Sequence, residues 1–176
     1  MNRGVLAGAI TWGGAAGLLG TAVMDLIMMG FFAATAMAPS LVYSFIGLVT
    51  EQSFLRLGVA LSGGVPLGAL VHFLLGLLLG LVFGLAVSRL NNWRLGSVVK
   101  GALLGVLYIE IVSQPILVLA PLLVRMTTAD VLQWYVLSTS MHLIYGIVLG
   151  VVLALRQRWL DRAAQHGIKG RSAASV

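Results

Sequence analysis

Four ionisable residues lie inside long apolar stretches of this sequence: Asp25, His72, Glu110 and His142. A charged side chain at the centre of a membrane helix costs roughly 2.5–3.5 kcal/mol on insertion scales, so such residues usually pair with one another and mark functional sites. Chains of carboxylate and imidazole groups relay protons, and the same groups are suitable ligands for Zn, Fe or Mn. We therefore predict that these four side chains form an intramembrane site for a proton or a divalent metal ion.

The two histidines open the same sequence pattern. VHFLLGLLLGLVFG at 71–84 and MHLIYGIVLGVVLA at 141–154 each place small residues at every fourth position after the histidine. Stripes of small residues let membrane helices approach each other closely. The residues that we expect at such helix contacts are Gly68, Gly76, Gly80, Gly84, Gly146 and Gly150.

The two acids also lie in matching segments. GLLGTAVMDL at 17–26 aligns with ALLGVLYIEI at 102–111, and this alignment places Asp25 opposite Glu110. Each half of the chain then has a helix with an acid, an outer loop and a helix with a histidine, which predicts two tandem helical hairpins related by an axis along the membrane normal. Polar residues that we expect to support the site from the same helix faces are Thr21, Ser113, Gln114 and Ser138.

The elements that must position these residues are membrane helices. Hydrophobic residues make up 60% of the chain and charged residues only 9%, whereas a soluble domain has about 25% charged residues. Four apolar runs reach the roughly 20 residues that a membrane span needs. They predict an all-α membrane protein that forms a single domain over 1–176, with repeats at about 8–88 and 98–155. The runs lie at 8–36, 65–88, 98–122 and 132–155.

The basic residues indicate how the chain is oriented. They gather before the first run, between the second and third runs and in the tail at 156–176, while only Arg56 and Arg125 fall in the other two loops. Because short cytoplasmic loops are enriched in Lys and Arg, we expect both termini to be cytoplasmic in a bacterial inner membrane. The net charge of +6 is explained by orientation in the lipid bilayer, and no basic patch with interleaved aromatic residues indicates nucleic-acid binding.

The first outer loop, at 38–64, has apolar residues at helical spacing together with a polar cluster at Glu51, Gln52 and Arg56. This pattern is typical of an amphipathic helix that lies in the membrane interface. The alternative is a lid over the bundle.

Residues 70–160 resemble the YagU-like family of small bacterial inner-membrane proteins. The resemblance rests on NNWRLG at 91–96 and YIEIVSQP at 108–115, together with the two intramembrane histidines. It implies a multi-helix inner-membrane protein, with a link to acid tolerance for the family's namesake. The sequence departs from the family's pattern at Glu110, where the resemblance leads us to expect a histidine, and at Asp25, where it leads us to expect no acid. The residues that it carries over are His72, Ser113, Pro115 and His142.

Other functions fit the same residues. His72 and His142 are candidate axial ligands of haem b, because a glycine one turn after each histidine would leave room for the macrocycle and Arg56 and Arg125 could face its propionates. The polar groups could instead hold together an accessory subunit of a larger membrane complex, or a homo-oligomer, by hydrogen bonds between helices. Methionines around Asp25 allow a Cu(I) variant of the metal site. No nucleophile–base pair, phosphate loop or dinucleotide motif indicates an enzyme, and the absence of cysteine excludes thiolate chemistry.

Overall fold

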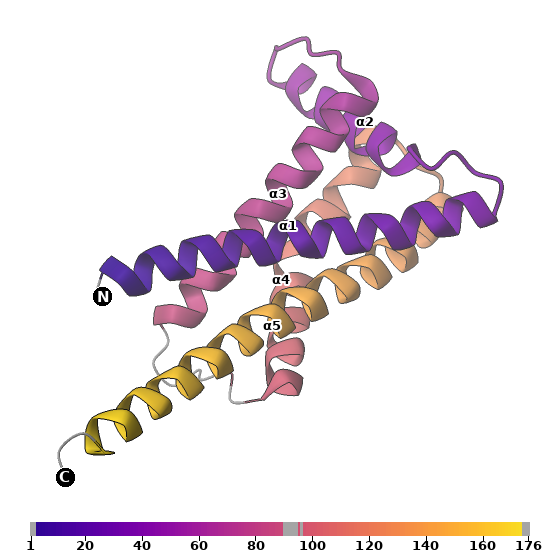
Figure 1. The fold of residues 1–176 in the computed structure, drawn as a ribbon. Helices are drawn as coiled ribbons and strands as arrows, with labels where there is room; N and C mark the ends of the chain where they lie inside the picture. The colour runs from indigo at the N-terminus through magenta and orange to yellow at the C-terminus, as the bar shows by residue number, and fades with distance from the viewer. Residues whose placement is uncertain (1–2, 90–94, 96, 174–176) are drawn as a thin grey trace.

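The computed structural model describes residues 3–89, 95 and 97–173, and all of its regular structure is helical (Figure 1). Residues 90–94 and 96, which include Arg94 of the basic loop and most of NNWRLG, lie outside the described residues. The helices are α1 (Arg3–Ala34), α2 (Leu41–Arg56), α3 (Gly64–Arg89), α4 (Val98–Val124) and α5 (Thr128–Ala173).

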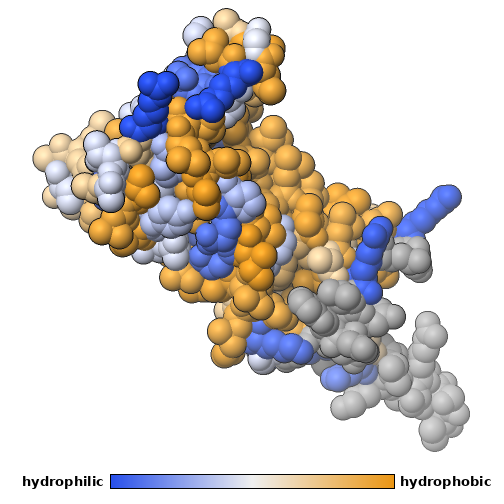
Figure 2. Space-filling model, turned by 180° about the vertical axis from the view of Figure 1, so that it is seen from behind, coloured by the Kyte–Doolittle hydropathy of each residue, from blue (hydrophilic) through white to orange (hydrophobic). Residues whose placement is uncertain are grey.

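Four of the helices are long and apolar enough to cross a membrane, which confirms the predicted spans. They are α1, α3, α4 and the part of α5 over Thr128–Gln165. Many large hydrophobic side chains on their surfaces are exposed, among them Leu26, Leu70 and Leu107. Hydrophobic residues cover most of the face shown in Figure 2. Such a surface is suited to contact with lipid, because soluble monomers rarely expose contiguous apolar patches of this extent.

The spanning helices associate mainly as two pairs, α1 with α3 and α4 with α5, and α1 also packs along α5 (Figure 1). Glycines let the backbones of each pair meet directly. A Cβ atom added at Gly13 would lie 2.6 Å from the carbonyl oxygen of Gly80, and one at Gly101 would lie 2.6 Å from that of Gly150. One turn further, Gly17 faces Gly76 and Gly80, and Gly105 faces Gly146 and Gly150.

Helix α2 packs against the start of α3 through a second set of glycines. A Cβ atom on Gly68 would collide with the backbone of Tyr43 and Gly47, so only glycine allows this approach. The Glu51 carboxylate of α2 also accepts the backbone N–H groups of Gly63 and Gly64, at 2.8 and 2.9 Å. The hydrogen bond from Gly64, and after it that from Gly63, lowers the pKa of Glu51, because each favours the charged form of the carboxyl group.

A hydrogen bond next to a proline joins the end of α4 to the start of α5. Pro121 lies inside α4, and because proline has no N–H it leaves the carbonyl of Leu117 without its usual helical partner. The indole Nε1 of Trp134 donates to that carbonyl at 3.2 Å and thereby holds the start of α5 against α4.

At its other end α5 continues to Ala173, well beyond the predicted end of the span at 155. The first residues of α1 and the last turns of α5 lie at the end of the bundle opposite α2 (Figure 1).

Candidate functional site

Asp25 and His72 form a buried pair between α1 and α3. The Nε2 atom of His72 lies 2.8 Å from Oδ1 of Asp25, and 4% of the Asp25 side chain is exposed against 15% of the His72 side chain. The sequence placed both residues in one interior because an unpaired acid is costly in a membrane, and the structure brings these two of the four together.

A third residue, Tyr43 of α2, completes the group. Its hydroxyl donates to Oδ2 of Asp25 at 2.7 Å, so both carboxylate oxygens have a partner. The Tyr43 ring also meets the His72 ring edge-on, with the ring centroids 6.0 Å apart. Burial raises the pKa of Tyr43, and the hydrogen bond to Asp25 and the charge of Asp25 raise it further. Tyr43 therefore stays protonated and acts as a hydrogen-bond donor.

The sequence reasoning missed Tyr43. It assigned the segment around Tyr43 to a helix in the membrane interface, where an amphipathic tyrosine is ordinary. The available signal was Gly68, which was expected at a helix contact but not at one with α2. The contact between Gly68 and the backbone of Tyr43 is what brings the tyrosine over the pair, so α2 also covers the site.

In the Tyr43–Asp25–His72 triad, the hydrogen bond between Asp25 and His72 is compatible with either protonation state of the imidazole. With His72 protonated, imidazolium and carboxylate form an ion pair; with His72 neutral, its Nε2–H still donates to Asp25. The hydrogen bond from Tyr43 supports the carboxylate in both states.

Side chains pack closely around Gly76, one turn after His72. The Thr21 hydroxyl bonds the carbonyl of Gly17 in its own helix at 3.0 Å and lies directly against Gly76. The Tyr145 hydroxyl donates to the carbonyl of Gly76 at 2.7 Å. The space that the haem hypothesis required beside this glycine is therefore filled by side chains, and Thr21 supports the packing without bonding Asp25.

Glu110 and His142 make no hydrogen bond with the triad among the described residues. Oε1 of Glu110 and Nδ1 of His142 are buried and have no hydrogen-bond partner in the part of the chain that the structure describes. Within the same residues, no three histidine or acidic side chains come together as metal ligands. Hydrogen bonds thus join two of the four predicted residues, Asp25 and His72, and Tyr43 extends this pair. That Glu110 and His142 belong to the same site stays a prediction.

The residues predicted to support the site differ in burial. Ser113 and Ser138 are buried, and the Ser113 hydroxyl approaches only the backbone carbonyl of Glu110, at 3.5 Å. Gln114 is exposed on the surface of α4. The step of one residue from Ser113 turns the helix by about 100°, which carries Gln114 off the buried face.

The glycine contacts assign a different partner to Asp25 in the second half of the chain. Gly17 and Gly105 occupy the same place at their crossings, since each faces the first two glycines after the histidine of the partner helix. Counting eight residues onward from each places Asp25 opposite Ser113. The sequence alignment, which paired Asp25 with Glu110, is therefore out of step by three residues with the helix packing.

The fold and the buried polar triad define this chain as an all-helical, multi-pass membrane protein. Residues 7–162 match a family of unknown function, DUF6789, and the chain belongs to that family. The resemblance of residues 70–160 to the YagU-like family stays a prediction, because the family model that matches is DUF6789. No curated protein and no solved structure matches the chain.

Proposed function

We propose that the protein is a membrane sensor or relay of protons, and that the Tyr43–Asp25–His72 triad binds the proton. The observation that carries this proposal is the occupation of both Asp25 oxygens, by the Tyr43 hydroxyl at 2.7 Å and by Nε2 of His72 at 2.8 Å. Two donors to one carboxylate stabilise its charged form inside the bundle, and the adjacent imidazole is a group that can take up a proton.

The exposed fractions of the His72 and Asp25 side chains favour one route for proton exchange. His72 is more accessible than Asp25, so protons enter and leave the triad through the imidazole. The site lies toward the end of the bundle that carries α2, because Tyr43 belongs to that helix. With the termini in the cytoplasm of a bacterium, as the basic residues favour, that end faces the outside of the inner membrane. The triad would then respond to external pH, in keeping with a role in acid stress.

A metal site is the weaker alternative. Stable protein sites for divalent transition metals usually have three or four protein ligands, and the described residues bring only Asp25 and His72 together as potential ligands. We assign no catalytic step to the triad.

The test is proton uptake by the purified protein in lipid nanodiscs. The protein is acidified from pH 8 to pH 5 and the protons bound are counted with an indicator dye. We expect His72→Gln to bind about one proton fewer per molecule than the wild type, since glutamine keeps a hydrogen bond to Asp25 without titrating. Infrared difference spectra over the same pH step report the Asp25 carboxylate, whose bands should change in the wild type and be lost in Asp25→Asn.

Two controls make the result decisive. Tyr43→Phe removes a donor but no titrating group, so its proton count should match the wild type if the protein is folded by circular dichroism and size-exclusion chromatography. Elemental analysis of the same samples tests the alternative. An unchanged proton count in His72→Gln contradicts the proposal, and a stoichiometric metal that is lost in His72→Gln replaces it with a metal site.

A further inference from the structure

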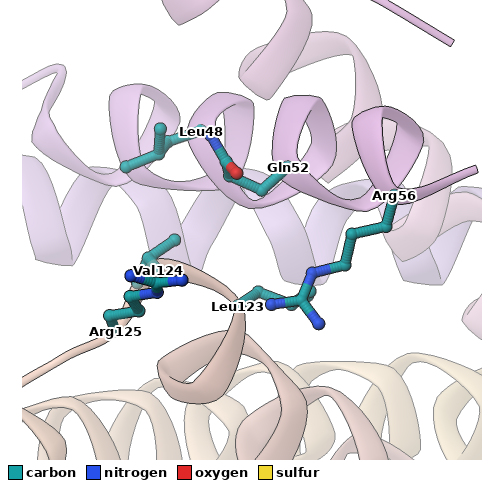
Figure 3. Close-up of a pocket in the computed structure, with 6 residues that line it drawn as sticks. All are labelled: Leu48, Gln52, Arg56, Leu123, Val124 and Arg125. Atoms are coloured by element: carbon teal, nitrogen blue, oxygen red, sulfur yellow. The ribbon is translucent and has the colours of Figure 1, made fainter. Parts of the chain in front are cut away.

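A polar pocket of about 510 Å³ lies between α2 and the end of α4. Three residues of α2 and three at the end of α4 line it, and none of them belongs to the triad (Figure 3). They are Leu48, Gln52, Arg56, Leu123, Val124 and Arg125.

Two arginines line the pocket. Arg56 reaches into it from the last turn of α2, and Arg125 from the residue that ends α4 (Figure 3). These are the two basic residues that the sequence places in the loops at this end of the bundle. Both arginines are exposed, so solvent screens their mutual repulsion. A bound anion would offset what remains of it.

No acid of the described chain supplies that anion. The ion pair found among these residues joins Asp25 to His72 and involves neither arginine. The acids nearest in sequence are engaged elsewhere, since Glu51 accepts the N–H groups of Gly63 and Gly64 and Asp130 accepts the hydroxyl of Thr127 at 2.7 Å.

The electrostatics of helix ends explains the position of each arginine, but it does not explain why both arginines line the same pocket. A cation near a helix C-terminus is favoured by the helix dipole, and both arginines occupy such positions. Arg125, however, has φ of 55°, a left-handed conformation in which glycine or asparagine is the usual residue. The strained backbone at this position carries an arginine whose side chain lines the same pocket as Arg56.

We propose that this pocket binds a phosphate group. A guanidinium presents paired N–H donors that match phosphate oxygens, and such charge-assisted pairs are among the strongest hydrogen bonds in proteins. The amide of Gln52 supplies a further donor from the same face of α2. The apolar side chains of Leu48, Leu123 and Val124 form the rest of the lining, where they contact the group that carries the phosphate. The phosphate belongs to a phospholipid headgroup or to a soluble phosphate ester.

The proposal is independent of the proton site, because it uses different residues and a different readout. The binding of spin-labelled phosphatidylglycerol to the detergent-purified full chain is measured by titration, with spin-labelled phosphatidylcholine and a neutral diacylglycerol for comparison. Inorganic phosphate and glycerol phosphate are added as competitors. Competition by the soluble phosphates identifies a site that recognises phosphate itself, and retention of phosphatidylglycerol against both identifies the lipid headgroup as the ligand.

The variants are Arg56→Gln, Arg125→Gln and the double substitution. Arg158→Gln is the matched control, since it removes one positive charge from an exposed position at the opposite end of α5. We expect each single variant to weaken phosphate-dependent binding several-fold, the double variant by at least tenfold, and the control to leave it unchanged. Arg125→Gly, which relieves the left-handed strain, should lose affinity as Arg125→Gln does. The proposal is overturned if the wild type shows no phosphate-dependent binding, if the double variant binds as well as the wild type, or if the control loses as much.

Discussion

The hydroxyl of Tyr43 lies 2.7 Å from Oδ2 of Asp25 and ties α2 to α1. The same helix is fixed to α3 by the backbone contact of Gly47 and Tyr43 with Gly68. Asp25 is thus held between one residue from α2 and one from α3. The interfacial helix predicted for this segment is therefore part of the site, and whatever moves α2 changes the surroundings of the buried acid.

Tyr43→Phe tests this attachment. The change leaves one oxygen of a buried carboxylate without its donor, which we expect to cost about 1–3 kcal/mol of unfolding free energy. Unfolding in mixed micelles of increasing denaturing detergent measures the loss. Tyr135→Phe is the matched control, because the Tyr135 hydroxyl makes no hydrogen bond with any described residue. Equal stability of the two variants would contradict a role for the Tyr43 hydrogen bond.

Gly80→Ala tests the crossing of α1 and α3. A Cβ atom at this position would come within 2.7 Å of the Gly17 Cα atom and 2.8 Å of its nitrogen, so the two backbones must separate. We expect a loss of about 1–3 kcal/mol, as for other overpacked contacts, measured by the same detergent unfolding. Gly30→Ala, where the added Cβ meets nothing within 4 Å, should be neutral or slightly stabilising because alanine favours the helix. A Gly80→Ala protein as stable as Gly30→Ala would contradict the packing.

The sequence predicted the four spans well because length and apolar composition alone determine them. The predicted run at 65–88 differs from α3, Gly64–Arg89, by one residue at each end. The Asp25–His72 pair was also within reach, since the cost of a lone charge in lipid requires a partner. Both results depend on local composition or on a strong energetic penalty.

What the sequence could not provide is the register between helices. Small residues every fourth position can be aligned in several ways, and a shift of three residues moved the partner of Asp25 from Ser113 to Glu110. Likewise, the position of Tyr43 depends on the approach of α2 to Gly68, a contact between segments that no periodicity connects. Tertiary packing decides such contacts, and a single sequence carries little information about them.

The hydrogen bonds from Gly63 and Gly64 to Glu51 predict that the stability of the backbone at the start of α3 depends on pH. The pKa of Glu51 is lowered from the ordinary value of 4.5 by the N–H groups of Gly64 and Gly63. A lowered pKa in the folded state means that the stabilisation is complete above the unfolded value and is lost as pH falls through the folded one. We expect the exchange protection of the Gly63 and Gly64 amides, corrected for intrinsic rates, to fall below pH 4.5. In Glu51→Gln the protection should be lower and independent of pH; the same pH dependence in that variant would assign it to another group.

Ser113→Asp tests the register that the glycine contacts assign. Ser113 is buried at the position equivalent to Asp25, and His142, the counterpart of His72, has a buried Nδ1 atom without a partner among the described residues. An aspartate at 113 should therefore bond His142, and ¹⁵N resonances of labelled histidine should show a second hydrogen-bonded imidazole. Combining Ser113→Asp with His142→Leu should cost about 3–5 kcal/mol of unfolding free energy relative to Ser113→Asp alone, because it leaves a buried charge unpaired. An unchanged His142 resonance would show that the α1–α3 and α4–α5 crossings are not equivalent. The sequence alignment of Asp25 with Glu110 would then be preferred.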